Sequence, residues 1–80
     1  MRTIGDSRYL EIITRLRLAR RARGLTQGDV AEMLSVPQSF VSKYETGERR
    51  LDVVELLDIC FVLGIEIQDV LPGKEREKRP

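Results

Sequence analysis

The chain has 80 residues, of which 14 are Lys or Arg and 13 are Asp or Glu, with a formal net charge of +1. This length supplies one domain and leaves no material for a second core. The 41% hydrophobic and 34% charged residues are typical of a folded, helix-rich globule. The first residues lack the apolar stretch of a signal peptide, and no segment approaches the roughly 20 apolar residues that span a bilayer. We therefore expect a cytoplasmic protein without membrane attachment.

The composition also argues against catalysis and metal binding. The sequence has no histidine, which removes the commonest general base and the commonest neutral metal ligand. Its one cysteine, Cys60, has no partner for an internal disulfide, and we expect it to pack as a small apolar residue. Because no nucleophile stands with a base in a recognisable pattern, we expect no enzyme, no metal and no cofactor.

Charge is distributed unevenly along the chain. Residues 1–50 contain ten Lys or Arg and six Asp or Glu, whereas residues 51–71 contain five acidic residues and no basic one. This asymmetry predicts one face for a polyanion and another face for a different partner. The last residues, 74–80, are charged and free of aromatic side chains, so we expect a frayed tail after a domain of residues 1–73.

Caps and turn residues predict the first two helices. Asp6 or Ser7 can cap the first, whose apolar residues recur at helical spacing, and Gly24 is a natural end for it. Thr26 followed by Asp29 three residues later resembles a capping box, so a short second helix is expected to begin there.

Three further helices complete an expected all-α, five-helix domain. The third is expected between Pro37, which lacks an N–H that the first turn does not need, and Gly47. Asp52 and Glu55 form a second capping-box pattern at the start of the fourth helix. The fifth is expected to be short, around residues 66–71.

The link between the second and third expected helices is short. Only about two residues, Ser35 and Val36, separate them, so the helices must cross steeply. That is the geometry of a helix-turn-helix, in which the second helix of the pair is presented to a DNA groove. When Val41 and Tyr44 face the core, the polar side chains of this helix face outward. These are Gln38, Ser39, Ser42, Lys43 and Thr46.

The joint spacing of these residues resembles the DNA-binding domain of the phage repressor and Cro family, or XRE-type regulators, over roughly residues 8–71. The residues that carry the resemblance are Leu25-Thr26-Gln27, Val30-Ala31, Leu34, Val41, Glu45, Gly47 and Leu63-Gly64-Ile65. It implies a compact domain of the lambda-repressor type with its helix-turn-helix at about residues 26–46. The chain departs from the family at Ser35, where glycine is frequent, so we expect a slightly strained turn.

The resemblance also implies roles for individual side chains. It implies that Gln27 clamps a DNA phosphate and that Arg20 pairs with Glu45 inside the fold. It assigns the reading of bases to Gln38, Ser39 and Lys43, whose donors and acceptors suit base edges in the major groove.

Other contacts are expected with the DNA backbone. The candidates are Ser42, Thr46, Arg49 and Arg50, since phosphate contacts fix register without reading sequence. The alternative is that these polar side chains are an ordinary solvated surface and that the arginine pair only aids solubility. Phe40 is expected to pack, although it lies near enough to the start of the third helix to touch a thymine methyl group.

The C-terminal third carries more apolar residues than one small core can cover. A residual apolar patch with acidic margins predicts a protein interface, most simply a symmetric homodimer. The residues expected in this interface are Ile59, Ile65, Ile67 and Val70.

Together these features predict a dimeric repressor that binds an inverted-repeat operator in double-stranded DNA. Two variants of the same fold remain open, an antitoxin with a toxin partner and the controller of a restriction–modification system. A rival from another class is a protein-interaction module that has lost DNA binding. The side chains that argue against this last alternative are Gln27, Gln38, Lys43 and the pair Arg49-Arg50.

Overall fold

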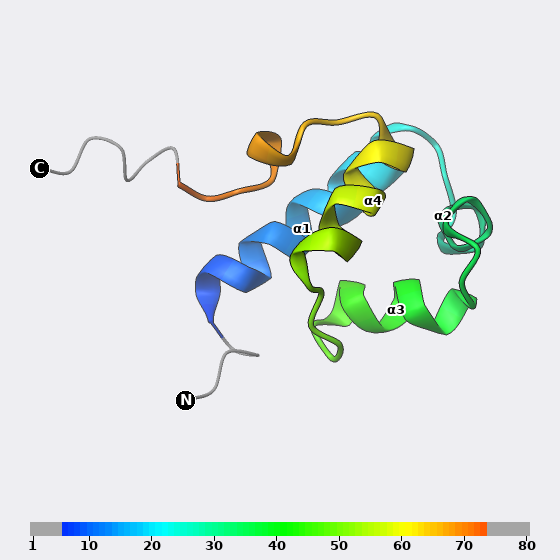
Figure 1. The fold of residues 1–80 in the computed structure, drawn as a ribbon, viewed down its shortest axis with the longest axis horizontal. Coiled ribbons are helices and arrows are strands. Elements are labelled where there is room, and N and C mark those ends of the chain that lie inside the picture. Colours follow the sequence, from blue (N-terminus) through cyan, green and yellow to red (C-terminus); the bar gives the residue numbers. More distant parts are fainter. Residues whose placement is uncertain (1–5, 74–80) are drawn as a thin grey trace, which may run out of the picture.

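A computed structural model of the chain describes residues 6–73, and the expected frayed tail, residues 74–80, lies outside the described residues. Four α-helices follow one another: α1 Ser7–Ala22, α2 Gln27–Leu34, α3 Gln38–Thr46 and α4 Val53–Leu63. In Figure 1, α4 lies in front of α1, α3 runs below both, and α2 stands at the right, seen end-on. The all-α class is confirmed, and the arrangement is that of a lambda-repressor-like domain.

The prediction of a fifth α-helix around residues 66–71 is wrong. Residues Ile67–Asp69 form a single 3-10 turn, in which the Glu66 N–H donates to the Asp69 carboxylate at 3.0 Å. The segment is bounded by Gly64 in the left-handed conformation and by Pro72, which disfavours helical geometry in the residue before it. The segment between them is too short to form the helical hydrogen bonds that would offset the cost of nucleating an α-helix.

The expected caps are present at the helix starts. Thr26 and Asp29 form a reciprocal capping box on α2, and Asp52 and Glu55 form one on α4. Hydrogen bonds from Thr26, first of all from its backbone N–H, lower the pKa of the Asp29 carboxyl, so this cap stays charged at neutral pH. Asp6 caps α1 by accepting the N–H of Arg8 at 2.8 Å. Local sequence therefore sets where α1, α2 and α4 begin.

The turn between α2 and α3 is closed by a residue in the left-handed region. Ser35 has φ 61° and ψ 44°, and it is the only non-glycine residue of the described chain with positive φ. This φ accounts for the strain expected at the turn, because a residue with a Cβ atom is disfavoured in the left-handed region. The following Val36 N–H donates to the Ala31 carbonyl at 3.0 Å, which satisfies a free carbonyl at the end of α2.

The core draws on every helix. Its largest fully buried side chains are Leu16, Val30, Val41, Tyr44, Ile59, Leu63 and Val70. Burying a large apolar side chain contributes about 1.5–3 kcal/mol, so these residues are the main source of stability. Cys60 is also buried, as expected, and burial raises the pKa of its thiol.

Tyr44 is the largest side chain in this core, and its hydroxyl has no hydrogen-bond partner among the described residues. Burial raises the pKa of the phenol, which therefore stays neutral. A buried hydroxyl without a partner costs about 1–3 kcal/mol. We predict that Tyr44→Phe leaves the free energy of unfolding unchanged or raises it by about 1 kcal/mol, measured by urea denaturation. A loss above about 1 kcal/mol would show that the hydroxyl is satisfied after all.

Candidate nucleic-acid interface

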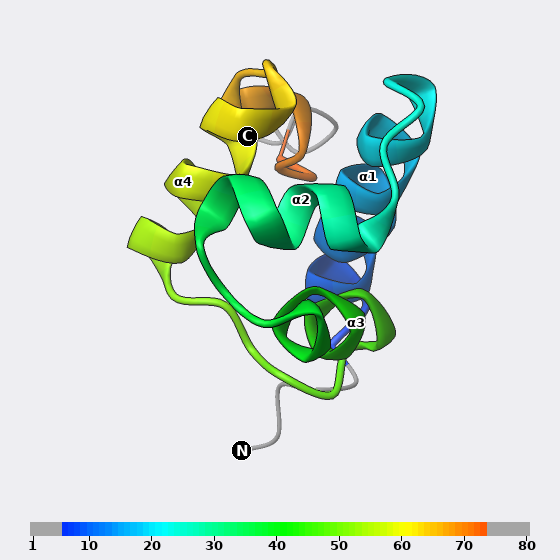
Figure 2. The ribbon, with the colours of Figure 1, turned by 90° about the vertical axis from the view of Figure 1, so that its right-hand side faces the viewer.

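The two helices of the motif cross steeply. Figure 2 shows α3 nearly end-on beneath the length of α2, so that one side of α3 packs on the domain and the other faces outward. Val41 and Tyr44 are fully buried on the inner side, whereas Gln38, Ser39 and Lys43 are exposed. The structure therefore brings the three expected base readers together on the outer surface of one helix.

The expected backbone contacts differ in accessibility. Ser42 is half-buried and Thr46 is exposed. The Thr46 hydroxyl donates to the Lys43 carbonyl at 3.0 Å and accepts the Glu48 N–H at 3.3 Å. Thr46 thus has a role at the end of α3 that does not depend on DNA.

A buried ion pair joins α1 to α3. Arg20 Nε donates to Glu45 Oε2 at 2.7 Å and Nη2 donates to Oε1 at 3.0 Å, while Nη1 donates to the Leu25 carbonyl at 2.8 Å. The side chains are only 9% and 3% exposed. The hydrogen bonds that Arg20 donates to Glu45 raise the pKa of the guanidinium, which therefore stays charged. This is the pairing that the family resemblance implies.

Hydrogen bonds extend from this pair to the surface. Gln27 Nε2 donates to Glu45 Oε1 at 3.0 Å, and Gln38 Nε2 reaches Gln27 Oε1 at 3.5 Å. Gln27 is half-buried at the first position of α2, where the free N–H groups of a helix start favour an anion. The network orients the amides of both glutamines from inside the domain. It therefore connects the core ion pair to the candidate base reader Gln38.

The two arginines of the α3–α4 loop occupy different environments. Arg50 is exposed, and its guanidinium lies 5.3 Å from the centre of the Tyr9 ring. Arg49 is half-buried, with bonds of 2.9 and 3.2 Å to the Glu55 carboxylate and its guanidinium 4.5 Å from the centre of the Phe40 ring. The charge of Arg49 is thus already paired within the chain. Its expected phosphate contact would require it to leave or share Glu55.

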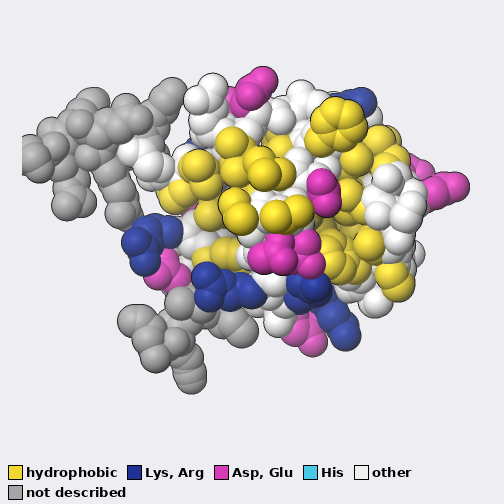
Figure 3. All heavy atoms as spheres, viewed as in Figure 1, with side chains coloured by type: hydrophobic (Ala, Val, Ile, Leu, Met, Phe, Trp, Pro, Cys, Tyr) yellow, Lys and Arg dark blue, Asp and Glu magenta, His cyan; other side chains and the backbone are white. Residues whose placement is uncertain are grey.

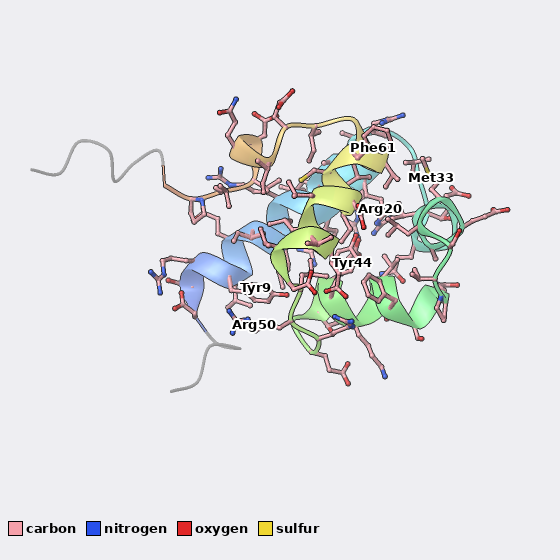
Figure 4. The ribbon with its side chains drawn as sticks, viewed as in Figure 1. Tyr9, Arg20, Met33, Tyr44, Arg50 and Phe61 are labelled. Carbon is pink, nitrogen blue, oxygen red and sulfur yellow. The ribbon has the colours of Figure 1, made fainter. Side chains whose placement is uncertain are left out.

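Tyr9 anchors the same loop, a role that sequence patterns missed. Its hydroxyl donates to the Arg49 carbonyl at 3.0 Å and accepts the Leu51 N–H at 3.1 Å, and burial raises the pKa of the phenol. Figure 4 shows Tyr9 and Arg50 side by side below α1. Helical spacing identifies Tyr9 only as a core-facing residue, and nothing local indicates that its hydroxyl meets a loop 40 residues away.

The prediction of the residues in the homodimer interface is wrong for Ile59 and Val70. Ile59 and Val70 are fully buried, at 0% and 1% exposure, because they pack inside a single protomer. Ile65 and Ile67 are half-buried. The outer face of α4 is formed instead by exposed apolar side chains that recur at helical spacing, and Figure 3 shows hydrophobic side chains gathered there above a row of Lys and Arg. Its members, which we call the α4 outer face, are Val53, Val54, Leu57 and Phe61.

Residues 6–73 contain neither a membrane-spanning helix nor a metal-binding cluster. Within that range no helix combines the length and apolar character needed to cross a membrane. Acidic residues and Cys60 form no cluster there that could hold a metal ion.

Comparison with known proteins agrees with this geometry. A helix-turn-helix family model matches residues 16–70, and the chain belongs to this helix-turn-helix family, in its XRE/Cro-like branch. The chain is similar to YqaE of Bacillus subtilis (strain 168), an uncharacterized HTH-type transcriptional regulator, with 30% identity over 63 residues. The match covers 79% of this chain but only about half, 54%, of YqaE.

Two solved structures resemble the whole domain. An XRE-family like protein from Pseudomonas syringae pv. tomato str. DC3000 is 43% identical with a TM-score of 0.81, over 95% of this chain and 93% of that chain. The restriction–modification controller protein C.AhdI from Aeromonas hydrophila is 29% identical with a TM-score of 0.75, over 81% of this chain and 98% of its own.

The buried pair leads to a stability prediction. Arg20→Ala and Glu45→Ala should each lower the free energy of unfolding by about 3–5 kcal/mol, because each leaves the other charge buried without a partner. The double variant should lose less than the sum of the two single losses in urea denaturation. Arg21→Ala, an exposed change on the same helix, is the control and should stay within about 0.5 kcal/mol of the unchanged protein. Strict additivity would contradict a direct interaction.

Proposed function

We propose that the protein is a dimeric repressor that binds an inverted-repeat operator and occludes a promoter. The observation that carries the proposal is the outer surface of α3. There Gln38, Ser39 and Lys43 are exposed together, while Val41 and Tyr44 hold the helix to the core. A polar helix presented in this way fits the major groove, where base edges offer distinguishable donors and acceptors.

The chemistry of the three side chains suits base reading. The amide of Gln38 can donate and accept together, as adenine requires, and the ammonium of Lys43 suits the acceptors of guanine. Ser39 can do either through its hydroxyl. Because the Gln38 amide already donates to Gln27, it would lose less conformational freedom when it binds a base.

Contacts with phosphates would set the register of α3 in the groove. We assign them to Gln27 at the start of α2, to Ser42 and Thr46 on α3, and to Arg50 in the following loop. Gln27 and Arg50 lie beyond opposite ends of α3 in the chain, so they would bracket the reading helix between two strands of backbone.

The dimer would form through the α4 outer face. Val53 is 64% and Phe61 84% exposed, and apolar side chains this open gain most from a partner. The face is turned toward the viewer in Figure 3, above the position that α3 has in the same view in Figure 1. A two-fold axis there would place two copies of α3 on one side of the duplex, about 34 Å apart.

The reading assignment predicts a difference between two exposed cations. Lys43→Ala, like Gln38→Ala, should cost about 1–3 kcal/mol on the preferred site and relax preference at one base position. Arg50→Ala should weaken all duplexes alike and reduce the slope of log affinity against log salt by about one unit. Equilibrium titration against the preferred and a random duplex separates the two. Equal losses on both duplexes for the α3 variants would refute the base-reading role.

The assembly predicts that Phe61→Asp gives folded monomers, because the interface would desolvate the new carboxylate. Sedimentation at micromolar concentration should show dimers for the unchanged protein and monomers for the variant, with weaker operator binding. Leu18→Asp is the control, since Leu18 is 56% exposed on α1 and lies outside the α4 outer face. An unchanged protein that is monomeric and still binds a site without symmetry tightly would contradict the dimer.

A second candidate function is the control of a restriction–modification system. It is favoured by the similarity to C.AhdI, because the match covers 98% of the C.AhdI chain. The two functions share DNA reading and differ in the regulated gene. A methyltransferase gene beside the coding sequence, with the preferred site upstream of it, would support the controller; its absence would leave the general repressor.

A further inference from the structure

Arg49 is held on three sides within the chain. Its guanidinium forms two parallel bonds with the Glu55 carboxylate, of 3.2 and 2.9 Å, and it lies over the Phe40 ring at 4.5 Å. Its Nη1 also donates to the Arg50 carbonyl at 2.8 Å. Such a two-pronged bond together with ring stacking is specific to a planar guanidinium, and a lysine could not reproduce it.

The partners of Arg49 belong to two different helices. Glu55 is in the first turn of α4 and accepts the Asp52 N–H at 2.9 Å as part of the α4 capping box, so its carboxylate is fixed. Phe40 is in the first turn of α3 and packs edge-on against Tyr44, with ring centres 5.8 Å apart. Arg49 therefore contacts the first turn of α4 through Glu55 and the first turn of α3 through Phe40.

Direct packing between these two helices is incomplete at this point. Phe40, Glu55 and Ile59 line a hollow of about 100 Å³ that also touches α2. The helix α3 packs chiefly on α1 and α2. Arg49 contacts Phe40 and Glu55, two of the residues that line this hollow, and thus supplies contact between the helices that the apolar core does not.

We propose that Arg49 is a positioning residue that acts through Phe40 and Glu55, and that it contacts no phosphate. The cluster Glu55–Arg49–Phe40, here called the clamp, fixes the first turn of α3 relative to α4. This inference rests on the proposed function, in which α3 reads bases and α4 forms the dimer. The clamp then holds each reading helix at a defined offset from the two-fold axis.

Substitutions that change the charge of the clamp can test this proposal. Glu55 neutralises Arg49, so the clamp adds little to attraction for phosphates. Glu55→Gln keeps the capping box, because glutamine can also accept at that position, and removes the charge that holds Arg49. The released Arg49 would then be a mobile cation near DNA, and α3 would lose its fixed offset.

The variant should therefore bind random duplex more tightly, with a salt slope steeper by up to about one unit, and bind the preferred site about tenfold more weakly. Arg49→Lys should also lose about tenfold on the preferred site although it keeps the charge. The matched control is Glu48→Gln, which makes the same charge change at an exposed position of the α3–α4 loop, outside the clamp. It should strengthen binding to both duplexes alike.

The opposite outcomes would overturn the clamp. If Arg49 binds phosphate in the unchanged protein, Arg49→Lys keeps specific binding and Glu55→Gln behaves like Glu48→Gln. A second measurement needs no DNA: hydrogen exchange of the α3 amides should accelerate in Glu55→Gln and not in Glu48→Gln. Unchanged exchange refutes the clamp even if DNA reading holds, whereas accelerated exchange supports it even if no specific site is ever found.

Discussion

The buried Arg20–Glu45 pair is the constraint on which the reading surface depends. Burying two charges costs several kcal/mol, and the cost is offset only when the remaining hydrogen-bonding groups are satisfied. Here the Leu25 carbonyl and the Gln27 amide satisfy them. The pair therefore ties α1, the α1–α2 turn, the start of α2 and the end of α3 into one arrangement. A shift of α3 would leave a charge buried without its partners.

The same arrangement also orients side chains at the surface of the domain. Glu45 holds Gln27, and Gln27 holds Gln38, so a surface amide is oriented by a core carboxylate. At the other side of the domain, Tyr9 and Arg49 hold the loop that carries Arg50. Both ends of α3, the proposed reading helix, are thus held by the rest of the domain. Binding then costs less ordering of loops and side chains than it would on a mobile surface.

Sequence alone predicted what depends on local chemistry. The capping boxes of α2 and α4 follow from a few adjacent residues, and the structure contains both. The strained turn at Ser35 was expected only because the family frequently has glycine there. The Arg20–Glu45 pair came only from the family resemblance, since 25 residues separate its partners.

Other features depend on which surfaces meet in three dimensions. Because α4 is apolar nearly all round, its periodicity could not show that Ile59 faces the core and Phe61 the solvent. The partners of Arg49 and of the Tyr9 hydroxyl are equally invisible in the sequence, since both are set by tertiary packing. A short segment before Pro72 likewise carried the residues of a helix but not the length for one.

The central claim is that two copies of α3 read DNA from a symmetric dimer. Selection of bound sites from a pool of random duplexes tests it most directly, because it presupposes neither the site nor the symmetry. The account predicts enrichment of an inverted repeat whose half-site centres are about 10–11 base pairs apart. A pool that shows no enriched sequence, or a single site without symmetry, would contradict it.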